Sequence, residues 1–89
     1  MAAKVEIYAT SFCRHCVAAR ELLNSKKVEY TEYLLDLYPL EKYSMTERCG
    51  QRSVPQIFIN DRHIGGQVEL AAMAASKELD ELLAESSAD

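Results

Sequence analysis

Apolar residues follow strand and helix spacings in turn along the chain. The run over residues 4–8 predicts a buried strand. From Cys13 to about Lys26 apolar residues recur at helical spacing, and Ser11 stands where a helix cap is expected. Residues 28–35 alternate loosely, which predicts a second strand. The first half of the chain therefore predicts a β-α-β unit with a right-handed crossover and parallel strands.

A second helix is predicted to begin at Pro39, whose fixed φ suits a first helical turn. Leu40, Tyr43 and Glu47 would then lie along one side of that helix. Gly50 is a natural stop, because glycine readily adopts the left-handed conformation that ends helices.

The rest of the chain predicts a hairpin and two short helices. Residues 56–59 form a strand pattern, residues 60–61 a turn signal, and residues 62–64 a partner strand before Gly65-Gly66. Helical spacing then returns at Leu70, Ala71, Met73, Ala74, Leu79, Leu82 and Leu83. The order β-α-β-α-β-β-α-α predicts an α/β, thioredoxin-like fold with a mixed four-stranded sheet flanked by helices.

Length and composition predict one globular domain over residues 1–89, with an ordered core at about 4–84 and a tail at 85–89. The chain has 89 residues, of which 48% are hydrophobic and 27% charged. A net charge of −4 argues against a nucleic-acid partner. The sequence shows neither a run of about 20 apolar residues nor a signal-peptide core. We therefore expect a cytoplasmic monomer without membrane association.

The pair Cys13-Arg14-His15-Cys16 carries the strongest chemical signal. It stands where the first strand gives way to a helix, and a helix N-terminus stabilises a thiolate. Cys13 is expected just ahead of the helix and exposed, so it would attack disulfides. Cys16, one turn in and facing inward, would resolve the mixed disulfide. Positive charge on Arg14 and protonated His15 would favour the Cys13 thiolate. The competing interpretation is a pair of ordinary core cysteines.

Two further motifs are weaker. In Ser53-Val54-Pro55, a cis proline would leave the Val54 backbone groups free to pair with a peptide-like substrate. The alternative interpretation is a proline that simply opens a strand. Gly65-Gly66 before a helix could offer backbone N–H groups to an anion, or form a plain turn. Cys49 is interpreted as a buried structural thiol and His63 as an exposed strand histidine. Cys13, His15 and Cys16 are too crowded to supply three of the four ligands of a zinc site, and the sequence has no second C-x-x-C pair.

Together these residues resemble the glutaredoxins, in particular the short bacterial dithiol class. The most specific stretch is Gly50-Gln51-Arg52-Ser53-Val54-Pro55-Gln56-Ile57-Phe58-Ile59-Asn60, followed by His63-Ile64-Gly65-Gly66. The resemblance implies a glutathione-dependent oxidoreductase that reduces protein disulfides and glutathione mixed disulfides. It implies glutathione as co-substrate, glutathione reductase as an indirect partner, and ribonucleotide reductase as one candidate target.

The resemblance also implies a set of glutathione-binding residues. Val54 would pair with the cysteinyl part, Gln51 and Arg52 would approach the glycine carboxylate, and Glu69 would face the amino group. The full implied set is Arg14, His15, Gln51, Arg52, Ser53, Val54, Pro55, Gly66, Gln67, Val68 and Glu69.

Three departures from the family pattern bear on these roles. Arg14-His15 replaces the usual proline-aromatic pair, Thr10 stands where a lysine is common, and Val68-Glu69 replaces a small polar or acidic residue and an aspartate. The first change predicts an unusually acidic Cys13 and a more oxidising couple. An alternative function is a glutathione-ligated [2Fe–2S] carrier, in which Cys13 of two chains would hold a shared cluster.

Overall fold

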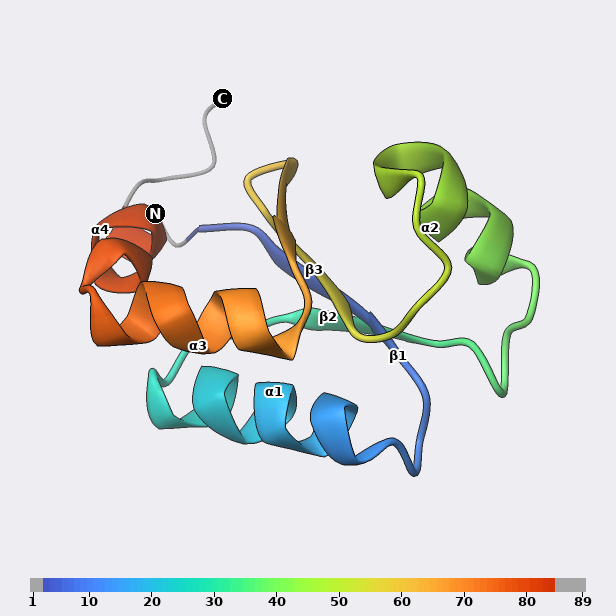
Figure 1. Cartoon of the computed structure of the whole chain (residues 1–89), viewed down its shortest axis with the longest axis horizontal. Helices are drawn as coiled ribbons and strands as arrows, with labels where there is room; N and C mark the ends of the chain where they lie inside the picture. The colour runs from blue at the N-terminus through green and yellow to red at the C-terminus, as the bar shows by residue number, and fades with distance from the viewer. Residues whose placement is uncertain (1–2, 85–89) are drawn as a thin grey trace.

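The computed structural model describes residues 3–84, so the predicted tail at 85–89 lies outside the described residues. A four-stranded sheet lies between helices (Figure 1). The elements are β1 (Val5–Ala9), α1 (Arg14–Ser25), β2 (Thr31–Leu34), α2 (Glu41–Cys49), β3 (Gln56–Ile59), β4 (Arg62–Gly65), α3 (Gln67–Ala75) and α4 (Glu78–Ala84). Their order is the one that the hydrophobic pattern predicts.

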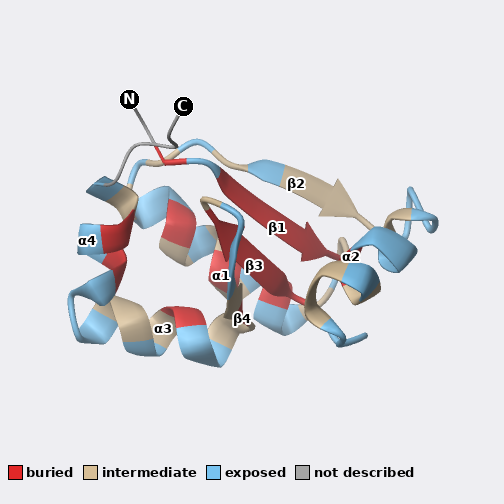
Figure 2. Cartoon of the chain, turned by 90° about the horizontal axis from the view of Figure 1, so that it is seen from above, coloured by how far each residue is buried: buried red, intermediate tan, exposed pale blue. Residues whose placement is uncertain are grey.

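The sheet has the order β2-β1-β3-β4 and is mixed, as predicted. Strand β1 pairs parallel with β2 and antiparallel with β3, where Ile7 lies opposite Ile57. Strands β3 and β4 form an antiparallel hairpin, whose turn residues Asn60 and Asp61 both have positive φ. All residues of the two central strands are buried (Figure 2).

Alternation along the central strands gives each face of the sheet its own core. Ile7, Ile57 and Ile59 pack with buried residues of α1, α3 and α4. Tyr8 and Phe58 point to the other face, where Met45 of α2 covers them.

Arg48 is a second anchor of α2 on this face. Its Nη2 atom donates to Glu6 Oε1 at 3.0 Å and its Nη1 atom to the Tyr8 hydroxyl at 3.0 Å. Its guanidinium carbon lies 3.9 Å from the centre of the Phe58 ring. Glu6 also accepts a bond from Tyr33. An ion pair therefore joins α2 to the central strand at a largely buried carboxylate.

The predicted cap of α1 and the predicted start of α2 were wrong. The N-cap of α1 is Cys13, in extended conformation, whereas the Ser11 N–H donates to the Asp36 carboxylate and Ser11 stays in the loop. Helix α2 begins at Glu41 rather than at Pro39, because residues 38–40 form a turn before it. Gly50 does end α2, with φ at 72°.

Candidate active site

The dithiol lies at the N-terminus of α1, as predicted. Cys13 is the last residue before the helix, as predicted, and is partly exposed, where an exposed thiol was expected. Cys16 is completely buried among the residues that α1 packs onto the sheet. Both thiols are free. The unequal burial means that only Cys13 is open to an incoming disulfide.

The pKa of the Cys13 thiol is lowered, mainly by a hydrogen bond from the backbone N–H of Cys16. Partial burial opposes this, while the Cys16 thiol and the His15 backbone N–H lower the pKa further. The charged side chain among the causes is Arg20, not Arg14. The sequence reasoning missed Arg20, although a residue seven positions after Cys13 lies two helical turns away on the same face.

Burial raises the pKa of the Cys16 thiol, which the sequence predicted to face inward. Thr10 opposes this rise through hydrogen bonds from its backbone and side chain. Thr10, which stands where a lysine is common in the resembled family, therefore favours the Cys16 thiolate. Cys13 is therefore the more acidic thiol of the pair and Cys16 the less acidic one.

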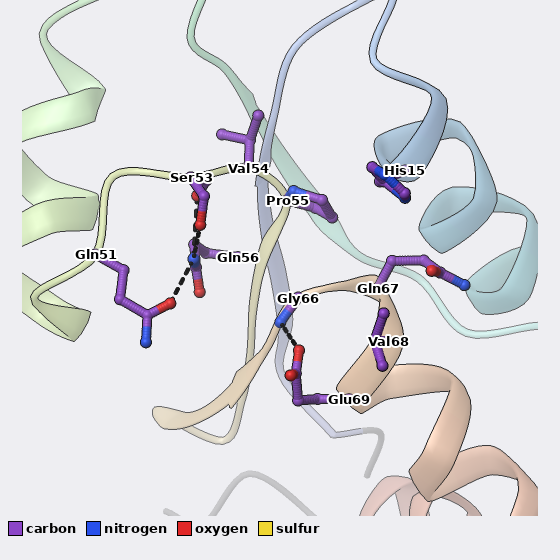
Figure 3. Close-up of a pocket in the computed structure, with 10 residues that line it drawn as sticks. All are labelled: His15, Gln51, Ser53, Val54, Pro55, Gln56, Gly66, Gln67, Val68 and Glu69. Atoms are coloured by element: carbon purple, nitrogen blue, oxygen red, sulfur yellow. Dashed lines mark hydrogen bonds between the residues drawn. The ribbon is translucent and has the colours of Figure 1, made fainter.

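Next to the dithiol lies a cavity of about 260 Å³ that gathers most of the residues predicted to bind glutathione. Three segments far apart in the chain line it: the start of α1, the loop before β3 and the start of α3 (Figure 3). The lining residues are His15, Gln51, Ser53, Val54, Pro55, Gln56, Gly66, Gln67, Val68 and Glu69. Nine of these were predicted, and Gln56 was not.

The loop before β3 contributes a free stretch of backbone to this cavity. The Val54–Pro55 peptide bond is cis, which is one of the two interpretations that the sequence left open. Within residues 3–84, the Val54 N–H and C=O make no hydrogen bond. A ligand with an extended peptide backbone can therefore pair with both groups.

The start of α3 forms the facing wall. The Gly66 N–H donates to Glu69 Oε1 at 2.7 Å, so the Glu69 carboxylate caps the helix and Gly66 is not a free donor. Gln67 and Val68 are the first two residues of the helix, where backbone N–H groups have no partner within the helix. These two N–H groups are therefore the donors available to an anion there.

Gln56 is the site residue that the sequence reasoning missed. Its side chain is 1% exposed, and it holds the loop before β3 through bonds to Gln51 and Ser53. A polar residue at the start of the otherwise apolar strand Gln56–Ile59 was the available signal, because buried polar side chains need partners.

Two predicted residues lie outside this cavity. Arg14 is exposed on α1, and Arg52 lines a neighbouring hollow of about 350 Å³ that also contacts Thr10 and Val54. Within residues 3–84, no cluster of three or more His, Cys, Asp or Glu side chains is suited to a metal ion. The shared-cluster alternative, which needs a second chain, stays a prediction. None of the helices in this range has the length and apolar character to cross a bilayer.

Comparisons with known proteins agree with this geometry. The family model described as Glutaredoxin matches residues 5–64. The chain is 44% identical to a probable glutaredoxin of Synechocystis over 93% of this chain and 96% of the relative. It is 43% identical to glutaredoxin 3 of Escherichia coli K12, over 91% and 98%. The structure of a buckwheat glutaredoxin–glutathione complex superposes with a TM-score of 0.83 at 23% identity, covering 91% of this chain and 76% of that one. The predicted thioredoxin-like fold is confirmed.

Proposed function

The chain belongs to the glutaredoxin family, and its family and fold support a thiol–disulfide oxidoreductase; we propose that its electrons come from glutathione. In this proposal it reduces glutathione mixed disulfides and protein disulfides through Cys13 and Cys16. The observation that carries the proposal is the cavity beside the dithiol. Among the described residues 3–84, it combines Val54 backbone groups that make no hydrogen bond with N–H groups at the start of α3 that have no partner within the helix.

The first step is attack of the Cys13 thiolate on a glutathione mixed disulfide. A bond forms between Cys13 Sγ and the glutathione sulfur, and the substrate leaves as a thiolate that takes up a proton. The lowered pKa of Cys13 favours the attacking form, and partial exposure gives the disulfide access. Cys13 is then glutathionylated and the substrate is reduced.

Two routes return Cys13 to its thiolate. A second glutathione thiolate can attack the glutathione sulfur, releasing oxidised glutathione. Alternatively, Cys16 loses its proton and attacks Cys13 Sγ, which releases glutathione and leaves a Cys13–Cys16 disulfide for two further glutathione molecules to reduce. The raised pKa of Cys16 keeps it protonated while Cys13 attacks.

The cavity walls suggest how glutathione lies. Val54 would pair with its cysteinyl backbone, and the N–H groups of Gln67 and Val68 would bind the γ-glutamyl carboxylate at the start of α3. Gln51 and Arg52 would meet the glycine carboxylate. That a relative of the same fold is a glutathione complex supports this ligand. The proposal includes a cytoplasmic setting, where glutathione keeps thiols reduced.

The test is turnover of the mixed disulfide of glutathione and 2-mercaptoethanol, coupled to glutathione reductase and NADPH. We expect Cys13→Ser to abolish turnover, because it removes the nucleophile, and Cys16→Ser to retain it through the second-glutathione route. Cys49→Ser is the matched control and should equal the wild type. Absence of wild-type turnover, or turnover by Cys13→Ser, would refute the proposal.

A further inference from the structure

Gln56 is a buried polar residue that joins two surfaces of the fold. Its Nε2 atom lies 3.0 Å from Gln51 Oε1, 3.0 Å from the Ser53 carbonyl oxygen and 3.2 Å from Ser53 Oγ. Its Oε1 atom lies 2.7 Å from His63 Nε2, on β4. The side chain therefore connects the cavity loop with the outer strand of the sheet.

The direction of these hydrogen bonds follows from the chemistry of the partners. The Ser53 carbonyl oxygen can only accept, so the NH₂ group of Gln56 must face the loop. The amide oxygen then faces His63, which must donate from Nε2. The opposite amide orientation would set two oxygens against each other at Ser53. The arrangement thus requires a proton on His63 Nε2.

The same logic determines how Gln51 faces the cavity. Its Oε1 atom accepts the bond from Gln56, which leaves its NH₂ group as the outward end (Figure 3). Within the part of the chain that the structure describes, that NH₂ group has no hydrogen-bond partner. The three side chains form a directed row in which His63 donates to Gln56 and Gln56 donates to Gln51. Each bond in such a row polarises the next.

We propose that His63 and Gln56 are positioning residues that hold the 51–53 loop and present the Gln51 amide as a donor to an anionic end of glutathione. This inference rests on the proposed function. His63 touches neither the dithiol nor the cavity, and its effect on substrate binding passes through Gln56. It is therefore more than the exposed strand histidine that the sequence suggests.

Two substitutions at His63 separate hydrogen bonding from packing. The His63 ring also contacts Phe58, with 5.1 Å between ring centres. His63→Phe keeps an aromatic ring there but removes the donor, whereas His63→Gln keeps a donor and removes the ring. We expect His63→Phe to raise KM for the glutathione mixed disulfide roughly three- to tenfold, with kcat within about twofold of wild type. His63→Gln should restore KM.

A purely structural role for His63 predicts the reverse order, with His63→Gln the weaker enzyme, and that result would overturn the inference. Gln56→Leu should raise KM at least as much as His63→Phe. In the Gln56→Leu background, His63→Phe should add no further effect, because its action passes through Gln56. Full additivity would overturn the inference. Arg62→Gln, on the same strand and exposed, is the matched control and should leave KM unchanged.

A readout without glutathione keeps the two proposals apart. In ¹⁵N–¹H spectra, His63→Phe should shift the backbone amide resonances of residues 51–53, and His63→Gln should shift them much less. If the wild type does not turn over the glutathione mixed disulfide, the proposed function fails. The loop resonances then decide the positioning role alone, and unchanged resonances in His63→Phe would overturn it.

Discussion

Replacing Arg48 with methionine tests whether a buried ion pair holds α2 against the sheet. Methionine keeps most of the side-chain length but removes the guanidinium. The substitution breaks the 3.0 Å bonds to Glu6 and Tyr8 and the contact with the face of Phe58. Glu6, whose side chain is only 7% exposed, then loses its main cationic partner.

The expected cost follows from what remains around Glu6. Removing one partner of a buried ion pair typically costs about 3–5 kcal/mol, because the other charge is left uncompensated. Here Tyr33 still donates to Glu6, Lys4 lies 3.9 Å away, and Arg48 is 27% exposed. These features place the expected loss of unfolding free energy at about 2–3 kcal/mol. In a domain of this size the melting temperature would fall by roughly 10–20 °C.

Urea unfolding of the reduced protein measures this loss. Lys26→Met is the control, since it breaks a 2.8 Å pair with Asp80, whose side chain is 47% exposed, and should cost less than about 1 kcal/mol. The double variant Glu6→Leu/Arg48→Met should lose less than the two single variants added together, by at least about 1 kcal/mol. The reasoning is refuted if Arg48→Met costs no more than Lys26→Met, or if the two single costs add.

The thiols and two glycines give further tests. The rate at which Cys13 reacts with iodoacetamide should stay at its high-pH value when the pH falls below about 8.5, the ordinary thiol pKa. The rate should fall only as the pH drops through the lowered pKa of Cys13, because the thiolate is then protonated. Cys16→Ala should move that midpoint upward by removing a thiol donor, and an unmoved midpoint would contradict the stated cause. Gly65→Ala should destabilise more than Gly50→Ala in urea unfolding. Both glycines have positive φ, which costs an alanine about 1–2 kcal/mol, but only at Gly65 would the added Cβ meet a side chain, 2.9 Å from Glu69 Cγ. Equal costs would show that this contact relaxes freely.

The elements and the dithiol roles were predictable because their causes are local. Strand alternation, helical spacing and Gly50 depend on residues close in sequence, and each appears in the structure near its predicted position. The acidic Cys13 and the buried Cys16 follow from their places at a helix start. The predicted Ser11 cap failed because Asp36, 25 residues away, holds the Ser11 backbone N–H.

Two effects that the sequence reasoning missed, those of Gln56 and Thr10, arise only through the fold. Arg20 is different, because it lies on the same face of α1 as Cys13 and helical spacing could have found it. Gln56 joins the cavity loop to His63 across the β-hairpin. Thr10, which follows β1, opposes the rise in the pKa of the buried Cys16 thiol. Such contacts carry no periodic signal, so a pattern of apolar spacing cannot find them.

By itself the sequence determined the order of strands and helices, the place of the dithiol and the residue types of the ligand cavity. These depend on backbone propensity and on burial of every second or every third to fourth side chain. Tertiary structure decided which polar groups stay free. In the folded chain, the Gly66 N–H donates to Glu69 and the Gln51 amide oxygen accepts from Gln56, so that the Gln51 NH₂ group faces outward. Within residues 3–84, the Val54 N–H and C=O make no hydrogen bond. The physical reason is that a hydrogen bond needs a partner at about 3 Å, and the fold alone brings distant partners that close.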